Sequence, residues 1–191
     1  MSQSKESNYK RRIILGIDPG TNIMGFGVID GSGKEPLYID MGVLDIRKEG
    51  DHYEKLKAIF ATTSKLIDNY KPDEVAVEAP FYGKNVQSML KLGRAQGVAL
   101  AAALYKDLPV FEYAPRKIKL AITGVGQASK EQVASMLERM FSIPDMPSNF
   151  DATDGLAAAV CHFYDSKSTG KSSGPKSWSD FIKKNPGRIS N

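Results

Sequence analysis

The chain has 191 residues, of which 41% are hydrophobic and 25% are charged, a composition typical of one globular domain with a buried core. A single cysteine, Cys161, excludes an internal disulfide, and two histidines are too few for a zinc cluster or a convincing Cys/His catalytic pair. The net charge of +4 and the pI near 9.0 favour a polyanionic partner without requiring one. No apolar run approaches the roughly 18 residues that cross a bilayer. The first residues, MSQSKESNYKRR, lack the apolar core of a signal peptide, so we expect a polar leader on a cytoplasmic protein.

The first half of the chain predicts an antiparallel meander followed by a helix. The leader, residues 1–10, is polar and is expected to be disordered. Short β-branched and apolar runs predict three strands, with the GSGK sequence at 31–34 as a hairpin connection: Ile13–Ile17, Phe26–Ile29 and Leu37–Leu44. From Tyr53 to Tyr70 the apolar residues recur at helical spacing, and the KPD sequence then ends that helix.

The second half alternates strands and helices. We expect strands at Glu74–Val77 and Pro109–Tyr113, a helix or loop over PRKIKLAITG, and three helices: Val86–Leu104, Lys130–Phe141 with Ser129 as its N-cap, and Asp151–Tyr164. After about Lys167 the composition shifts to Ser, Gly, Lys and Pro, which is typical of a flexible tail. The order predicts an α/β domain over 11–166, with a mixed five-stranded sheet, helices on both faces, and a basic tail over 167–191.

Four carboxylates stand at the edges of apolar runs: Asp18 in ILGIDPGT, Glu78 in VAVEAPF, and Asp151 and Asp154 in DATDGLAAA. In the predicted sheet, Asp18 and Glu78 end strands that can be neighbours, and the other two occupy the first turn of a helix packed nearby. Carboxylates that converge on one point repel each other unless a hard divalent cation neutralises them. The pattern indicates a metal-dependent phosphoryl-transfer site, in which two Mg²⁺ ions about 3.5–4 Å apart would stabilise the attacking and leaving oxygens.

Each acidic segment also has a purely structural interpretation. Asp151 is a natural N-cap, and the helix dipole favours Asp154 in the first turn. Glu78 after an apolar strand needs a partner, which a salt bridge would supply as well as a metal would. Asp18 with Pro19 and Gly20 makes a good turn whatever its function.

Taken in order, four segments resemble the RuvC-type crossover junction endodeoxyribonucleases, the bacterial Holliday junction resolvases of the ribonuclease-H-like superfamily. The segments are ILGIDPGTNIMGFGVI, VAVEAPFYGKNVQSMLKLG, LPVFEYAPRKIKLAITGVGQASKEQV and NFDATDGLAAAVCH, and the resemblance spans about Ile13 to Tyr164. It implies a ribonuclease-H-like fold and a metal-binding catalytic set of Asp18, Glu78, Asp151 and Asp154, holding two Mg²⁺ ions for which Mn²⁺ can substitute. Some relatives carry His where this chain has Asp154.

The resemblance also implies a function. Such an enzyme is a cytoplasmic homodimer that resolves four-way DNA junctions in recombination and repair. It cuts two opposing strands symmetrically and works with the RuvA and RuvB branch-migration proteins. The sequence departs from the commoner family order, LGQARG, at Arg94 in LKLGRAQG.

Several further residues are candidates for DNA contact, each with a structural alternative. Phe81, in the loop after Glu78, either wedges into an opened junction or plugs the core, and the resemblance favours the wedge. The remaining candidates either contact phosphates or form a solvated face: Lys84, Asn85, Arg116, Lys117, Lys119 and Lys130. The resemblance would place Lys119 and Lys130 beside the scissile phosphates.

The small residues of the 86–104 helix suit either a two-fold interface between copies or packing within one copy. Trp178 and Phe181 in the tail either dock a partner or belong to a disordered segment.

Two other classes of function deserve comparison with a junction nuclease. An actin-like or sugar-kinase-like ATPase also has an Asp–x–Gly–Thr loop after its first strand, but it needs a second domain for which this chain is too short. A ribonuclease-H-like DNA-binding module that has lost catalysis would not need all four carboxylates.

Overall fold

A five-stranded mixed sheet forms the centre of the molecule, as the sequence predicted. The computed structural model describes residues 11–80, 85–143 and 150–169. The strands are β1 (Ile13–Asp18), β2 (Ile23–Asp30), β3 (Leu37–Asp45), β4 (Glu74–Glu78) and β5 (Val110–Tyr113), in the order β3-β2-β1-β4-β5. The first three strands form the antiparallel meander, and β4 pairs in parallel with both β1 and β5.

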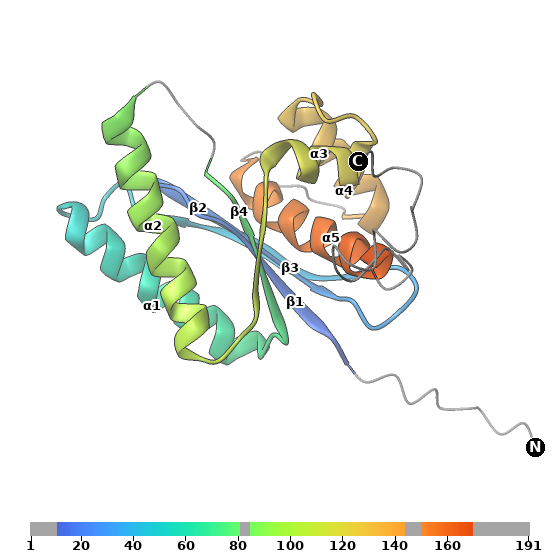
Figure 1. The fold of residues 1–191 in the computed structure, drawn as a ribbon, viewed down its shortest axis with the longest axis horizontal. Coiled ribbons are helices and arrows are strands. Elements are labelled where there is room, and N and C mark those ends of the chain that lie inside the picture. Colours follow the sequence, from blue (N-terminus) through green and yellow to red (C-terminus); the bar gives the residue numbers. More distant parts are fainter. Residues whose placement is uncertain (1–10, 81–84, 144–149, 170–191) are drawn as a thin grey trace, which may run out of the picture.

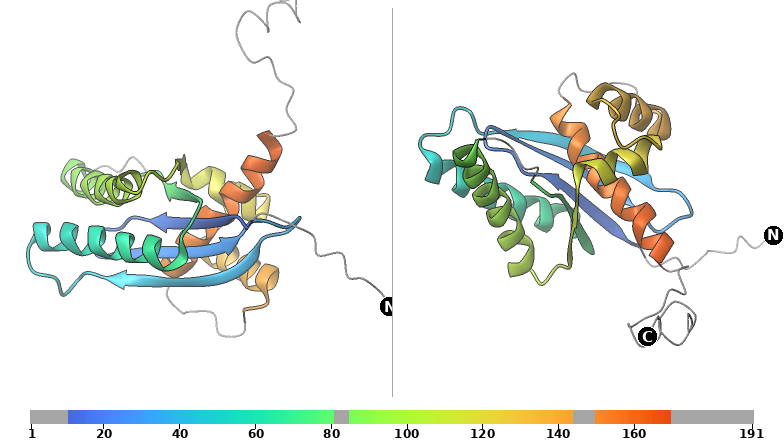
Figure 2. Two further views of the ribbon diagram at one scale, coloured as in Figure 1. Left: turned by 90° about the horizontal axis from the view of Figure 1, so that it is seen from below. Right: turned by 45° about the horizontal axis from the view of Figure 1, so that its top comes forward.

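Helices cover both faces of this sheet (Figures 1 and 2). On one face lie α1 (His52–Tyr70) and α2 (Val86–Tyr105); on the other lie α3 (Pro115–Thr123), α4 (Lys130–Phe141) and α5 (Asp151–Thr169). Because successive residues of a strand point to opposite faces, Leu15 and Ile17 pack with α1 and α2, whereas Ile14 packs with α5. The central strands of the sheet are therefore buried on both sides, which explains the near-continuous apolar runs in β1 and β4.

The backbone of α5 lies directly against β1 and β2 because glycines face each other at the crossing. A Cβ atom at Gly16 would stand 2.1 Å from the carbonyl oxygen of Gly155, and one at Gly25 would stand 1.8 Å from that of Asp151. Such separations are possible only without side chains, since the contacted atoms are backbone. The first turn of α5 is thereby held within backbone contact of the carboxyl ends of β1 and the start of β2.

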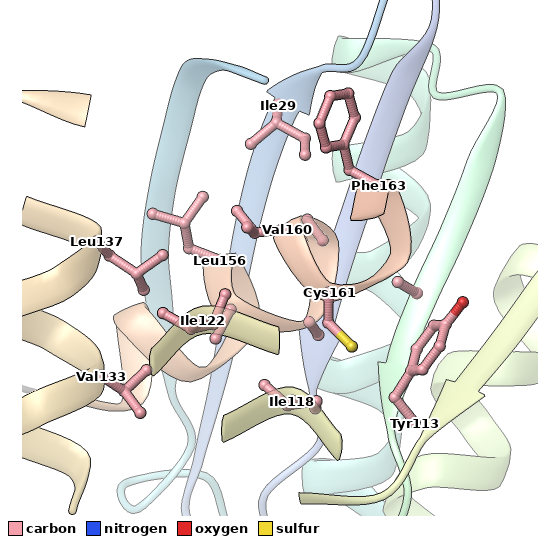
Figure 3. Close-up of a cluster of buried hydrophobic side chains, with 14 of the residues drawn as sticks. Ile29, Tyr113, Ile118, Ile122, Val133, Leu137, Leu156, Val160, Cys161 and Phe163 are labelled. Carbon is pink, nitrogen blue, oxygen red and sulfur yellow. The ribbon is translucent and has the colours of Figure 1, made fainter. Parts of the chain in front are cut away.

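The helices α3 and α4 pack on the outer side of α5, in the cluster that Figure 3 shows. The contacts join α5 to the sheet on one side and to these helices on the other: Ile29, Leu156, Val160, Ile118, Ile122, Val133 and Leu137. A capping box at Ser129 and Gln132 begins α4, which confirms the predicted N-cap. Cys161 is fully buried in this cluster, and burial raises the pKa of its thiol, as expected for an inert structural cysteine.

Helix α5 begins at Asp151 as predicted, but Asp151 does not cap it and the helix extends beyond its predicted end. Asp151 is its first helical residue rather than its N-cap, because the carbonyl oxygen of Phe150 accepts from Asp154 N at 3.1 Å. At the other end the helix continues past Tyr164 to Thr169, where Lys167 Nζ donates to Gly33 O at 2.8 Å. This contact ties the last turn to the β2–β3 connection, and the sequence pattern alone does not show it.

A buried polar network lies at the opposite end of α5 from the acidic residues. His162 is 1% exposed, its Nε2 lies 2.7 Å from Glu74 Oε2, and its Nδ1 lies 2.7 Å from the Tyr113 hydroxyl. Arg12 forms an ion pair with the same Glu74 oxygen. The network joins Arg12, directly before β1, to β4, β5 and α5, so it fixes the C-terminal half of α5 against the sheet. Among the described residues, no helix is long and apolar enough to cross a membrane.

Candidate active site

Three of the four predicted carboxylates line one small cavity at the carboxyl edge of the sheet. Asp18 is the last residue of β1 and Glu78 is the last residue of β4, and these two strands are parallel neighbours. Asp154, in the first turn of α5, lines the same cavity of about 70 Å³, together with Lys119 and Lys130. The topology thus brings together residues that are 60 and 76 positions apart in the sequence.

Burial and mutual repulsion dominate the electrostatics of this cavity. Burial, followed by the charge of Asp154, raises the pKa of Asp18 to about 7, and Asp151 adds to the rise. Burial, followed by the charges of Asp18 and Asp154, raises the pKa of Glu78 to about 8. Near neutral pH, ionisation of one of these carboxyls therefore disfavours ionisation of the other. Such a site is stabilised by positive charge placed near the carboxyls.

Lys130 supplies part of that charge. Its Nζ donates to Asp154 Oδ2 and lies 3.8 Å from Asp151 Oδ1, so it links the two acids of α5. Burial opposes the charge of Lys130, but the hydrogen bond to Asp154 and the charges of Asp18 and Asp151 outweigh it and raise its pKa. Lys119 forms no ion pair with any described residue. Its positive charge nevertheless offsets part of the rise in the pKa of both Glu78 and Asp154.

The chemistry of the donor set suits a hard divalent cation, because every donor is a carboxylate oxygen and no histidine or cysteine intrudes. Within the part of the chain that the structure describes, however, no three acidic, histidine or cysteine side chains stand close enough together to ligate one ion. The Nζ atom of Lys130 lies between the carboxylates of Asp151 and Asp154, the position that a cation shared by the two carboxylates would take. Since an ammonium and a divalent cation compete for the same oxygens, this arrangement fits a metal site in which Lys130 must yield.

The alternative interpretation of Glu78 as a salt-bridge residue finds no support here. No ion pair to Glu78 occurs within residues 11–80, 85–143 and 150–169. Among neighbouring charges, Asp18 and Asp154 affect its pKa most and repel it, while Lys130 and Lys119 offset part of this repulsion. The helix-dipole interpretation of Asp154 remains valid alongside its place in the cavity, because both follow from its position in the first turn.

The other predicted DNA-binding residues divide into three groups. Lys130 contacts the carboxylates of α5, and Lys119 lines the same cavity. Asn85 instead caps α2, where its side chain accepts from Ser88 N at 3.1 Å, and Arg116 is exposed beside Gly126, outside the cavity lining. Phe81 and Lys84 lie outside the described residues, as do Trp178 and Phe181.

A second cavity of about 170 Å³ adjoins the carboxylates and was not predicted from the sequence. It shares Asp18 and Glu78 with the first cavity, and Leu92 and Gln96 of α2 form its far wall. Gln96 is 7% exposed and donates to Glu112 Oε2 at 2.8 Å, so it is held in place. The spacing of four between Leu92 and Gln96 places both on one face of the helix, which is the signal that could have identified them.

Comparison with known proteins agrees with this geometry. The family model described as crossover junction endodeoxyribonuclease RuvC matches residues 14–162. The chain is 59% identical to the crossover junction endodeoxyribonuclease RuvC of Christiangramia forsetii, over 99% of this chain and 100% of the relative. It is 61% identical to the protein of that name from Bacteroides fragilis, over 94% of this chain and 97% of the relative.

Solved structures show the same likeness. The structure of Thermus thermophilus RuvC in complex with a Holliday junction substrate superimposes with a TM-score of 0.76 at 31% identity, covering 83% of this chain and 97% of that one. The yeast mitochondrial Holliday junction resolvase Ydc2 shares the fold, with a TM-score of 0.58 at 12% identity, over 83% of this chain and 82% of that one. On the strength of the matched family model, the full-length relatives and the acidic cavity at the sheet edge, the chain belongs to the RuvC family of crossover junction endodeoxyribonucleases.

Proposed function

We propose that this endonuclease cuts two opposing strands of a four-way DNA junction symmetrically, with Asp18, Glu78, Asp151 and Asp154 as the catalytic carboxylates of each copy in a homodimer. The observation that carries this proposal is the cavity in which Asp18, Glu78 and Asp154 meet two lysines, on a chain of the RuvC family. The raised pKa values of Asp18 and Glu78 support it, because carboxyls brought together for structure alone would cost stability without return.

The four carboxylates would hold two Mg²⁺ ions, or Mn²⁺ in their place, which when bound supply positive charge to the attacking and leaving oxygens of the phosphodiester. The chain's own contribution is position and charge. The ends of β1 and β4 fix Asp18 and Glu78 side by side, and the glycine contacts of α5 fix Asp151 and Asp154 opposite them. Lys119 and Lys130 add positive charge beside the scissile phosphate, where burial strengthens its effect.

One exposed face of α2 supports the homodimer. Val86, Leu90 and Leu104 are 68%, 51% and 59% exposed, and they recur at the spacing of a two-helix seam together with Gly93 and Gly97. A Cβ at either glycine would meet no described atom within 4 Å, so these glycines do not serve packing within one copy. The opposite face of the helix, with Ala95, Ala99 and Ala103, packs inside the domain. Packing within one copy thus accounts for the small residues of one face, and we propose the two-fold interface for the other.

Further parts of the proposed function rest on family membership. Phe81 follows Glu78 by three residues, and we propose that it wedges between bases of the opened junction. We also propose cooperation with the RuvA and RuvB branch-migration proteins in the bacterial cytoplasm.

A cleavage assay on a synthetic four-way junction tests the catalytic assignment. Wild type should nick two opposing strands with Mg²⁺, whereas Asp18→Asn and Glu78→Gln should bind the junction without cutting it. Glu49→Gln, an exposed change of the same chemistry, should cut like wild type. Equal cutting by wild type and the two site variants would contradict the assignment.

Sedimentation velocity tests the dimer. Leu90→Lys places a charge in the α2 seam and should convert dimers to monomers, whereas Lys65→Gln on α1 should leave the dimer intact. A Leu90→Lys protein that remains dimeric would place the interface elsewhere. For the wedge, Phe81→Ala should bind the junction and cut it slowly.

A further inference from the structure

A polar cavity of about 410 Å³ shares no lining residue with the two carboxylate cavities and has no role in the catalytic assignment. It is formed where the β1–β2 turn meets the starts of α1 and α2, which lie at the same end of the sheet (Figure 1). Its chemically active lining consists of two lysines, one histidine, one amide and two hydroxyls: Lys55, Lys91, His52, Asn22, Thr21 and Ser88. A lining rich in donors and lacking acids is suited to an anion.

His52 provides the first indication that a ligand is missing. Its Nε2 is buried and has no hydrogen-bond partner, and it is the one such side-chain atom within the described part of the chain. A buried nitrogen left without a partner costs stability, so native proteins nearly always satisfy it. Other atoms of His52 line the cavity, so a rotation of the ring would turn the enclosed Nε2 towards an anion bound there.

The two lysines provide the second indication. Neither Lys55 nor Lys91 forms an ion pair with any residue that the structure describes. Lys55 Nζ is directed to the β1–β2 turn, where it lies 3.3 Å from Asn22 Oδ1. The neighbouring acid, Asp51, is occupied in capping α1, accepting from Tyr53 N at 2.8 Å. Among the described residues, no acidic side chain forms an ion pair with the lysines of the cavity.

The position of the cavity favours a DNA phosphate as the anion. Thr21 follows Asp18 by three residues, so a single turn joins the cavity to the carboxylates over at most about 11 Å. On α2, Lys91 is adjacent to Leu92, which lines the second cavity at Asp18 and Glu78. A DNA strand carries one phosphate for every 3.4 Å or so of helix rise, so this distance corresponds to about three nucleotides.

We propose that His52, Lys55 and Lys91 bind a backbone phosphate of the cleaved strand, within about three nucleotides of the bond cut at Asp18 and Glu78. The side chains of Asn22 and Ser88 complete the donor set around this phosphate. The inference rests on the proposed placement of the scissile phosphate at the carboxylates. The cavity positions the strand and takes no part in the chemistry.

The salt dependence of junction binding, measured without divalent cation so that no strand is cut, gives the first test. Each phosphate contact by a lysine adds about one to the slope of log affinity against log salt. Lys55→Gln and Lys91→Gln should each lower that slope by about one and weaken binding about tenfold at low salt. Lys65→Gln removes the same charge from α1 ten residues away and should change neither quantity by as much. His52→Phe keeps a ring but removes the nitrogen, and it should weaken binding without changing the slope.

Replacing single phosphates by uncharged methylphosphonates locates the contact. When this replacement is scanned along the cleaved strand, wild type should bind more weakly to a junction modified at one phosphate within three nucleotides of the cleaved bond. Lys55→Gln should bind that modified junction no more weakly than it binds the unmodified one. The proposal is overturned if Lys55→Gln and Lys91→Gln bind the junction with the same affinity and salt slope as Lys65→Gln. It is also overturned if the phosphate whose replacement no longer weakens binding by these variants lies more than three nucleotides from the cleaved bond. A failure of the catalytic assignment is seen separately, as cutting by Asp18→Asn, and leaves these binding measurements interpretable.

Discussion

Neutralising Glu78 should make the protein more stable while it abolishes cleavage. In the folded state, burial and the charges of Asp18 and Asp154 raise the pKa of Glu78 from its usual 4.5 to about 8. Glu78→Gln removes the charge and keeps nearly the same shape. The variant therefore measures how much free energy the wild type stores in repulsion at this site.

The magnitude follows from proton linkage. Since the folded-state pKa lies above the unfolded value, wild-type stability is lost as the pH rises from about 4.5 towards about 8. Each tenfold change in proton affinity corresponds to about 1.4 kcal/mol, so the full difference amounts to roughly 4–5 kcal/mol. Asp18 shares this energy with Glu78, which leaves about 2–4 kcal/mol for Glu78 alone at pH 8 and about 1 kcal/mol at pH 5.

Urea unfolding without divalent cation, at pH 5 and pH 8, is the appropriate assay. Glu78→Gln should have a larger free energy of unfolding than wild type, and the difference should be larger at pH 8 than at pH 5. The control Glu49→Gln should stay within about 0.5 kcal/mol of wild type at both pH values. Added Mg²⁺ should then stabilise wild type more than the variant, because the cation binds only the folded site. An equal difference at the two pH values, or a destabilised variant at pH 8, would refute the reasoning.

Three further changes test separate parts of the structure. Gly25→Ala directs a Cβ at the carbonyl oxygen of Asp151. Thermal melting should therefore show a loss of about 1–3 kcal/mol in stability, and the junction assay should show a loss of cutting. Unchanged cutting would show that α5 can shift without affecting the site. Lys130→Gln removes the cation beside Asp154 and should slow single-turnover cleavage about 100-fold, whereas the exposed change Lys48→Gln should not. Burial lowers the pKa of His162 from its usual 6.5 despite Glu74, so the stability advantage of wild type over His162→Gln should shrink as pH falls below about 6.5; an advantage that grows would contradict this sign.

Much of the fold was predictable because local patterns and tertiary demands agree. The strand runs of β1 and β4 are apolar because both faces are covered, and Ser129 and Gln132 mark the start of α4 without ambiguity. The end of α5 was misplaced because its last turn depends on Lys167 reaching the carbonyls of another connection. On composition alone, residues 167–169 are assigned to the tail.

The candidate site was predictable in part. The sequence predicted that Asp18, Glu78, Asp151 and Asp154 converge; the structure brings Asp18, Glu78 and Asp154 to one cavity, whose lining does not include Asp151. The link from Lys130 to Asp151 and Asp154 was not foreseen, since a side-chain hydrogen bond depends on how α4 packs against α5. The cavity of Lys55 and Lys91 was also missed. These lysines are 36 residues apart, and each alone resembles an ordinary solvated charge.

The glycine contacts beneath α5 restrict how this sequence can vary over evolution. Gly16 lies two residues before Asp18, and Gly155 directly follows Asp154, so the residues that permit the contact and the proposed catalytic residues occupy the same short segments. No layer of side chains lies between the backbones to absorb a substitution by changing rotamer. A mutation in the contact can be accommodated only by displacing the helix, and the helix carries two of the acids with it. Selection for packing and selection for catalysis therefore act here on one inseparable unit.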